Sequence, residues 1–146
     1  YMAATSESRS VVIAELLSGL TVADLIDDTE PVHEETPLEE VFGRMFGARR
    51  SDLAVVDASG DIVGVLTASA LKEVPRAEYT TRTVGEILRT DLPRIDSEMT
   101  AADGLHELVR GRSDVAIVER DGAAVGLVSR GDFMSALDLR RESVPF

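Results

Sequence analysis

The sequence contains no cysteine and no tryptophan, and Lys72 is its single lysine. Without cysteine, neither a disulfide nor a thiolate metal site can contribute to the fold. No apolar run approaches the roughly 20 residues that a membrane-spanning helix requires, and no signal-peptide pattern opens the chain. A glycine-rich phosphate loop of the Walker or dinucleotide type is also missing. These absences predict a soluble piece that does not itself insert into a membrane.

The charge is strongly one-sided, with 27 acidic against 15 basic residues and a formal net charge of −12. Nucleic acid and anionic membrane are poor partners for such a surface. Acid-rich, lysine-poor surfaces resemble those of proteins from salt-loving archaea, and an ordinary acidic protein from a GC-rich genome is the alternative. The 146 residues, 44% of them hydrophobic, suffice for one domain or for two small halves that share a core.

The main feature of the sequence is a duplicated stretch. Residues 50–67 recur as residues 112–129, so that Ser51 and Gly64 reappear 62 positions later as Ser113 and Gly126. Each copy has an apolar run ending in an acidic residue, a glycine-containing turn and a second apolar run, which predicts a β-hairpin. Two copies are too few for a solenoid. We therefore expect one unit that is duplicated and paired with itself, with a cleft between the halves as the place for a ligand.

The same order of elements surrounds both hairpins. We expect an amphipathic helix that begins after Ser8 or Ser10, stops near Gly19 and packs on the first half. Each repeat then has a helical turn (21–26, 83–88), an edge strand (31–34, 93–96), a helix (37–48, 100–110), the hairpin and a closing helix. The helices are predicted to bury Leu38, Val41, Phe42, Met45 and Phe46 in the first half, and Ala101, Leu105, Leu108 and Val109 in the second, one position out of register.

The predicted organisation has five segments. Residues 1–20 form an N-terminal tail and helix, 21–74 the first repeat, 75–82 a linker, 83–139 the second repeat and 140–146 a C-terminal tail. The second closing helix contains Phe133, Met134, Ala136 and Leu137.

The hairpin of the second copy closes with Gly126, two apolar residues, Ser129 and, three positions later, Asp132. This motif, within a duplicated strand–helix–strand–strand–helix order, resembles a CBS-domain pair, or Bateman module, over about residues 21–139. The resemblance implies an α+β fold of tandem CBS domains packed through their sheets with pseudo-twofold symmetry. It also implies a regulatory module and a homodimer formed through helix faces.

Two flanking segments, 16–25 and 74–84, are similar to the CBS pairs at the cytosolic end of site-2-protease-type membrane zinc metalloproteases. This narrower resemblance implies a cytoplasmic module that regulates a membrane-embedded parent protein.

Residues 129–132 have two interpretations. Ser129 and Asp132 fit a capping box, in which each side chain bonds the other's backbone N–H. They also fit a nucleotide site, because a carboxylate can accept both ribose hydroxyls and a helix N-terminus suits phosphate. The resemblance implies that Asp132 holds the ribose of an adenosine-containing ligand: AMP, ADP, ATP or S-adenosylmethionine, with AMP fitting best. The first copy has Ala70 where this aspartate would stand, which predicts one competent site and one weak or empty site.

By pseudo-symmetry, the competent cleft takes residues from both halves, and backbone groups near Glu30 to Val32 would meet the adenine edge. The predicted lining residues are Asp28, Glu30, Val32, Ser51, Ser113, Ser129, Gly131 and Asp132.

The sequence contains no complete motif for metal or nucleophilic catalysis. His33-Glu34 superficially resembles the start of a zinc-binding His-Glu-x-x-His motif, but Pro37 occupies the second ligand position and His106 lies on another helix. No Gly-x-Ser-x-Gly nucleophile motif occurs. We therefore expect no catalytic residues and no intrinsic metal. The alternative to a ligand sensor is a purely structural dimerisation module that binds no small molecule.

Overall fold

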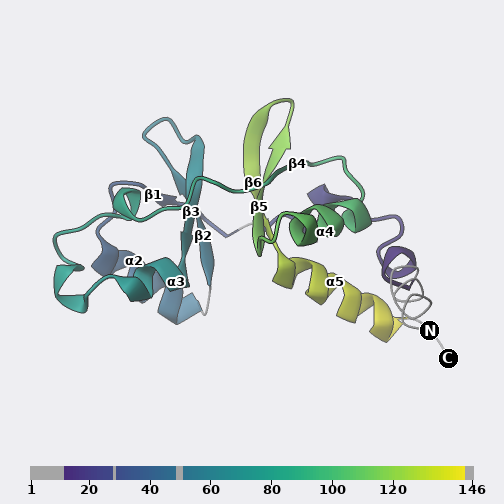
Figure 1. The fold of residues 1–146 in the computed structure, drawn as a ribbon, viewed down its shortest axis with the longest axis horizontal. Helices are drawn as coiled ribbons and strands as arrows, with labels where there is room; N and C mark the ends of the chain where they lie inside the picture. The colour runs from purple at the N-terminus through teal and green to yellow at the C-terminus, as the bar shows by residue number, and fades with distance from the viewer. Residues whose placement is uncertain (1–11, 28, 49–50, 144–146) are drawn as a thin grey trace. The chain divides into compact units, whose positions relative to one another are not determined.

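The structure, a computed structural model, describes residues 12–27, 29–48 and 51–143. Within them, each repeat builds a three-stranded mixed sheet, with strand orders β1-β2-β3 and β4-β5-β6 (Figure 1). Packing divides the described residues into two units. The first-repeat unit comprises 29–92, and the second-repeat unit joins 12–27 to 93–143. The predicted α+β class and the duplicated order of elements are confirmed.

In the first-repeat unit, β1 (Val32–His33) runs parallel to β2 (Asp52–Val56), which pairs antiparallel with β3 (Ile62–Thr67). The helices are α2 (Leu38–Ala48) and α3 (Ala68–Glu73), and two 3₁₀ turns follow, η2 (Arg76–Glu78) and η3 (Val84–Glu86). Apolar residues of α2, β2 and β3 form the centre of its core; Leu38, Val41, Val55, Val65 and Leu66 are almost completely buried.

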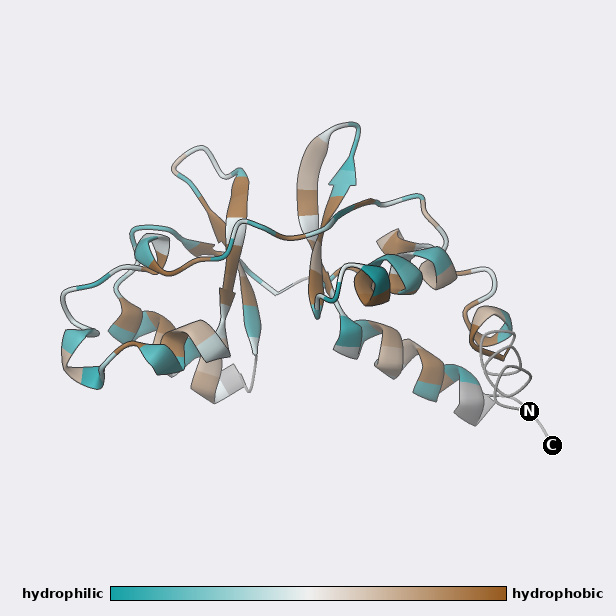
Figure 2. Cartoon of the chain, in the orientation of Figure 1, coloured by the Kyte–Doolittle hydropathy of each residue, from teal (hydrophilic) through white to brown (hydrophobic). Residues whose placement is uncertain are grey.

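The second-repeat unit has the same plan. A 3₁₀ turn, η1 (Val22–Leu25), is followed by β4 (Arg94–Asp96), α4 (Ala101–Arg110), β5 (Val115–Arg120), β6 (Ala123–Ser129) and α5 (Arg130–Ser143). Strand β5 buries four consecutive apolar residues, and brown, apolar stretches lie on the strands of both hairpins in Figure 2. The loop that joins β5 to β6 is Asp121-Gly122, and both residues have positive φ angles (52° and 81°). Aspartate and glycine tolerate this conformation best, so the Asp-Gly pair fixes the hairpin register.

Each sheet is covered by the segment that opens the other repeat in the sequence. The N–H groups of Val22 and Ala23 donate to Met99 and Ser97, both at 2.9 Å, and Asp27 N–H donates to Leu127 O at 3.0 Å. The first-repeat unit has the equivalent bonds. There Val84 and Gly85 donate to Thr36 (3.0 Å) and Glu34 (2.7 Å), and Val65 and Arg89 exchange backbone bonds of 2.8 and 2.9 Å. The segments 21–27 and 83–89 are thus exchanged between the sequence repeats.

The duplicated Val-Gly of the hairpins makes this exchange possible. A Cβ atom added to Gly126 would come within 2.5 Å of Ile26 Cγ2, and one added to Gly64 would come within 2.5 Å of Arg89 O and also contact Leu88 Cδ1. Ile26 and Leu88 are equivalent residues of the exchanged segments. Each segment therefore lies against bare backbone where any side chain would hold it away.

Several expectations need correction. The N-terminal helix, of which residues 12–16 are described as helical, was expected on the first half. Leu17 instead packs in the core of the second-repeat unit, because it leads into the exchanged segment. Residues 75–82, the segment predicted to link the repeats, pack on the first-repeat unit, where Tyr79 is buried and its hydroxyl donates to Leu71 O at 2.8 Å. Helix α5 reaches Ser143, so residues 140–143 of the predicted tail are helical.

Two residues predicted to be buried are exposed. Phe46 is 77% exposed and Val109 52% exposed. They occupy the same place in α2 and α4, one residue after the buried Met45 and Leu108. The apolar stripe of each helix is wider than its contact with the sheet. No helix among the described residues has the length and apolarity needed to cross a membrane.

Gly64→Ala tests the exchanged packing. The added Cβ meets the Arg89 carbonyl, a backbone group that cannot rotate away, so we expect a loss of about 2 kcal/mol or more in unfolding free energy. Gly43→Ala is the matched control, because Gly43 lies in α2 with open space around its Cα. This control should be neutral or stabilise by up to about 1 kcal/mol. Urea unfolding of both variants measures the difference, and equal stabilities would contradict the close approach.

Glu86 provides a pH test of the same segment. The backbone N–H of Thr83 donates to its carboxylate at 2.7 Å and holds the pKa of Glu86 below its ordinary value, and Arg82 nearby adds to the effect. A depressed carboxyl contributes stability above the unfolded-state pKa, and the contribution disappears as the pH falls through the folded-state pKa. We expect an NMR titration of Glu86 to show a low midpoint that returns to the ordinary value in urea. A midpoint at or above the ordinary value in the folded protein would contradict the capping geometry.

Candidate functional site

The N-terminus of α5 is built by Ser129 and Asp132. Ser129 N–H donates to Asp132 Oδ2 at 2.7 Å and its hydroxyl donates to the same oxygen at 3.0 Å, while Asp132 N–H donates to Ser129 Oγ at 3.3 Å. This is the predicted capping box, and it holds the carboxylate in one orientation. Toward the described residues, every recorded hydrogen bond of the Asp132 carboxylate uses Oδ2. Oδ1 is therefore available to accept from a ligand.

Of the next two backbone N–H groups in this turn, one has a recorded hydrogen-bond acceptor and the other does not. Arg130 N–H donates to Asp114 O at 2.8 Å, which ties the helix start to the residue before β5. For Gly131 N–H, no partner is recorded among the described residues, as expected for a first-turn amide of a helix. The Arg130 guanidinium lies 3.9 Å from an Asp114 carboxylate oxygen, at the surface. The turn thus presents one free donor, one carboxylate oxygen and a nearby cation.

Ser113 lies at the same end of the sheet. It is buried, and its hydroxyl donates to Val115 O at 2.7 Å. Since Val115 pairs with Ser129 across β5 and β6, Ser113 lies near the start of α5. The structure therefore brings together the four predicted residues of the second repeat, Ser113, Ser129, Gly131 and Asp132, although the Ser113 hydroxyl is occupied by the backbone.

The predicted residues of the first repeat lie in the other unit. Val32 is buried in β1, and its parallel pairing with Val55 places the residues before β1 at the same end of the sheet as Ser51. The Arg44 guanidinium donates to the carbonyls of Glu30 and Pro31. Arg44 thus fixes the backbone expected to meet an adenine, a role that the sequence did not predict. Asp28 falls outside the described residues.

Comparison with known proteins identifies the family. The sequence matches the CBS domain twice, over residues 22–76 and 84–139, which together cover more than half of the chain. The chain belongs to the CBS-domain family. Comparison with curated proteins gave no significant match.

Solved structures of CBS domains share the whole fold. The CBS domain of a bacterial CNNM/CorC family Mg²⁺ transporter in complex with ATP is 26% identical, with a TM-score of 0.74 and coverage of 91% of this chain and 97% of that one. The CBS domain of a CBS domain-containing membrane protein from Sphaerobacter thermophilus is 20% identical (TM-score 0.69, coverage 91% and 97%). The CBS domains of a Streptococcus pneumoniae transcriptional regulator are 18% identical (TM-score 0.67, coverage 81% and 99%).

The first CBS repeat has a simpler helix start. Thr67 caps α3 and accepts a hydrogen bond from Ala70 N–H at 3.1 Å. Because Ala70 has no carboxylate, the reciprocal bond of the capping box is absent from α3. The two repeats therefore differ in the chemistry of their helix starts.

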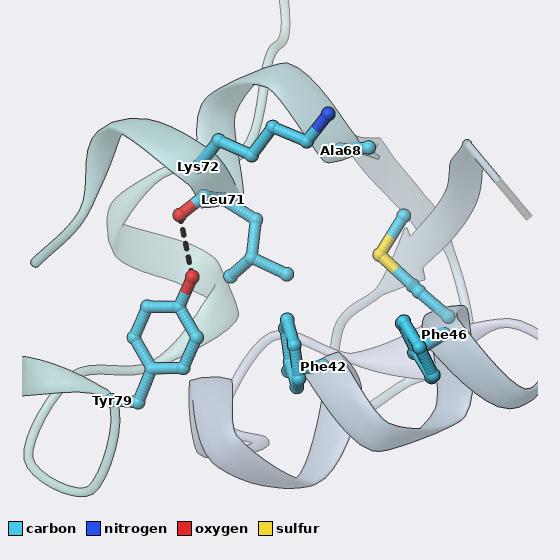
Figure 3. Close-up of a pocket in the computed structure, with 7 residues that line it drawn as sticks. Phe42, Phe46, Ala68, Leu71, Lys72 and Tyr79 are labelled. Carbon is cyan, nitrogen blue, oxygen red and sulfur yellow. Dashed lines mark hydrogen bonds between the residues drawn. The ribbon is translucent and has the colours of Figure 1, made fainter. Parts of the chain in front are cut away.

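The CBS pair also has a cavity that the sequence did not predict. It lies in the first-repeat unit, has a volume of about 380 Å³, and is lined by Phe42, Met45, Phe46, Ala68, Leu71, Lys72 and Tyr79. Figure 3 shows the Phe42 and Phe46 rings rising from α2 toward α3, with Lys72 at its edge. We call it the α2–α3 groove. It contains none of the predicted site residues, and its only sequence signal is a stripe of apolar residues on α2 that is wider than a core requires.

Acidic and histidine side chains do not cluster in the part of the CBS pair that the structure describes. No group of three or more histidine, aspartate or glutamate side chains is arranged there to hold a metal ion.

Asp132→Ala should lower the stability of the CBS pair even without ligand. It removes the acceptor of two hydrogen bonds from Ser129, and loss of a helix cap costs about 1 kcal/mol. Thr67→Ala, which removes the cap of α3, is the matched variant and should cost a similar amount. Thermal unfolding without ligand measures both, and an unchanged midpoint for Asp132→Ala would show that the box contributes nothing.

Proposed function

We propose that this CBS pair is a non-catalytic regulatory module that binds an adenosine-containing ligand, with AMP as the first candidate. The ligand would lie in a cleft formed by both repeats, lined by the eight predicted residues, and would control an attached effector. One observation carries the proposal, namely the oriented Asp132 carboxylate beside the free Gly131 N–H at the start of α5. A relative at 26% identity whose structure contains ATP supports the ligand class.

The chemistry of this turn suits a nucleoside phosphate. Asp132 Oδ1 can accept from a ribose hydroxyl while Oδ2 remains bonded to Ser129, so that binding does not require the cap to break. Gly131 N–H and the dipole of the 14-residue helix α5 favour a phosphate oxygen. Gly131 also lacks a side chain that would cover this amide. A Cβ atom added to Gly131 would have Ser129 Oγ as its nearest neighbour, at 3.6 Å.

Charge favours a ligand with few phosphates. The chain carries a net charge of −12, and the predicted lining includes Asp28 and Glu30. A triphosphate in such surroundings needs a bound cation such as Mg²⁺, whereas a monophosphate or the cationic S-adenosylmethionine does not. Arg130 is the cation nearest to the helix start and can offset part of the charge of a monophosphate.

Regulation requires that the ligand distinguish two states of the module. A ligand with equal affinity for both arrangements of the repeats shifts nothing, however tightly it binds. We propose that binding changes the angle between the repeats, or the geometry of a homodimer formed through helix faces, and so biases the effector.

For the effector, we propose a site-2-protease-type membrane zinc metalloprotease, with this module on its cytoplasmic side. The support is the similarity of residues 16–25 and 74–84 to the CBS pairs of such proteases. The acidic, lysine-poor composition supports a salt-loving archaeal source. The parent protein, and not this module, would hold the membrane-spanning segments and the zinc.

A second candidate function is a purely structural dimerisation module. The observation that favours it is the exposed apolar face of the helices, with Phe46 at 77% and Val109 at 52% exposure. In this reading the faces join two chains, and the start of α5 is a helix cap without a ligand.

Ligand binding distinguishes the two functions. We expect one of AMP, ADP, ATP with or without Mg²⁺, or S-adenosylmethionine to raise the unfolding temperature in high-salt buffer. At 100 times Kd the linkage amounts to about 2.7 kcal/mol, or several degrees. Asp132→Ala should lower the ligand affinity at least tenfold by calorimetry.

Thr67→Ala controls for the loss of a helix cap. It should lower stability like Asp132→Ala but leave ligand affinity within about twofold, because its cap belongs to the repeat that lacks the aspartate. If none of the ligands binds to folded wild-type protein, the structural dimerisation module replaces the sensor.

A further inference from the structure

The α2–α3 groove has an apolar interior. Three of the described residues that line it are aromatic and none is acidic, although the chain has 27 acidic residues. Phe42 and Phe46 stack with centroids 6.0 Å apart, and Phe46 is 77% exposed, so its ring forms an open wall. The Tyr79 hydroxyl already donates to Leu71 O at 2.8 Å (Figure 3). Whatever enters the groove therefore has to be apolar where it meets the rings.

Two cations stand at the edge of the groove. Lys72 lies in the last turn of α3. The Arg76 guanidinium lies 3.9 Å from the centre of the Phe42 ring and 5.1 Å from that of Tyr79, which holds its charge beside the groove. Neither cation has a recorded ion pair with the part of the chain that the structure describes. Both charges are thus available to an anionic group from outside.

The size of the groove favours a small molecule over a macromolecule. Its volume of about 380 Å³ lies within the range of roughly 300–1,000 Å³ that is usual for small-molecule sites. A partner helix would need a groove that accepts side chains over at least two helical turns, whereas α3 has only six residues. The net charge of −12 opposes an anionic bilayer. The occupant that fits is a single free molecule.

The second repeat lacks this combination of charge and aromatic surface. The residues at the equivalent positions are Leu105 and Val109 for the two phenylalanines, Met134 for Lys72 and Asp138 for Arg76. Duplication has therefore kept an apolar helix face in both repeats but cations in the first alone. An anion with an apolar body would select the first repeat.

We propose that the α2–α3 groove binds a small amphipathic carboxylate, such as a medium-chain fatty acid. Its apolar chain lies against Phe42 and Phe46, and its carboxylate lies at Lys72 and Arg76. A guanidinium stacked on a ring keeps its N–H groups free in its own plane, where they can bind a carboxylate. The lining includes none of the eight residues predicted for the adenosine-containing ligand. The two sites are therefore separate, and either can exist without the other.

Decanoate is the probe that tests this site. In ¹³C-methyl methionine NMR spectra, the signal of Met45, which lines the groove, should shift and saturate with decanoate. The signal of Met99, in the second-repeat unit, should stay in place. 1-Decanol has the same chain without the charge and should bind about fivefold more weakly. Decyltrimethylammonium should also bind more weakly, although the net charge of the protein favours it.

Substitutions at exposed residues separate the charge from the apolar wall. Lys72→Glu puts a like charge beside the carboxylate and should weaken decanoate binding at least tenfold, while 1-decanol stays within about twofold. Phe46→Ala removes one wall and should weaken both ligands about fivefold. Val109→Ala, at the equivalent position of α4, is the matched control and should change neither affinity. Thermal unfolding checks that each variant remains folded.

Four outcomes would overturn the proposal. If decanoate binds no more tightly than 1-decanol, or as tightly to Lys72→Glu as to wild type, the cations take no part. Equal shifts of Met45 and Met99 would place the anion outside the groove. Binding of the protein to phosphatidylglycerol vesicles, without a Met45 shift in free decanoate, would replace the soluble ligand by a membrane surface.

The fourth outcome concerns the proposed homodimer, which would also use helix faces and can cover the groove. Titrations are therefore run at protein concentrations where sedimentation velocity shows a monomer. A dimer that persists at the lowest measurable concentration, with no Met45 shift in decanoate, would assign the groove to the second copy and overturn the ligand.

Discussion

The close approach of an exchanged segment to a bare glycine organises both halves of the chain. At Gly64 and at Gly126 the strand backbone touches a segment that belongs, in sequence, to the other repeat. Because each sheet has only three strands, this segment completes the cover of its core. The position of the sheet then fixes where β3 and β6 end, and so where α3 and α5 begin. The site and the groove both depend on those helix starts.

Much of this could be predicted from the sequence, because the signals are local. Hairpins, helix caps and the Ser129–Asp132 box involve residues within a few positions of each other, and duplication showed each pattern twice. The exchange could not be predicted, because η1 bonds to residues more than 70 positions away and no local pattern says which sheet it will cover. Phe46 and Val109 were misassigned for a related reason. The apolar residues of a helix recur with the same period whether they face a core or a partner. Only the width of the stripe indicates that some of its residues lie outside the core.

The two repeats share a backbone plan but differ in the side chains that matter for function. At the helix start, Ser129 and Asp132 form a reciprocal polar cap, whereas Thr67 and Ala70 form half of one. On the helix faces, the aromatic rings of Phe42 and Phe46 in the first repeat stand where the second has the smaller Leu105 and Val109. A strictly symmetric pair of repeats would have two equal helix starts. Divergence at a few positions leaves one helix start with a carboxylate and one without, on the same backbone plan.

The ligand proposal and the dimer proposal meet on α5. Asp132 stands in its first turn, and Met134 and Asp138 follow within the next two turns of the same helix. A helix moves as one body over so short a length, so a ligand bound at its start would also shift the exposed face that the proposed homodimer uses. Coupling of this kind is reciprocal: any factor by which ligand tightens the dimer is the factor by which dimerisation tightens ligand binding. Sensing and assembly would then be two measurements of one equilibrium, set by the position of α5.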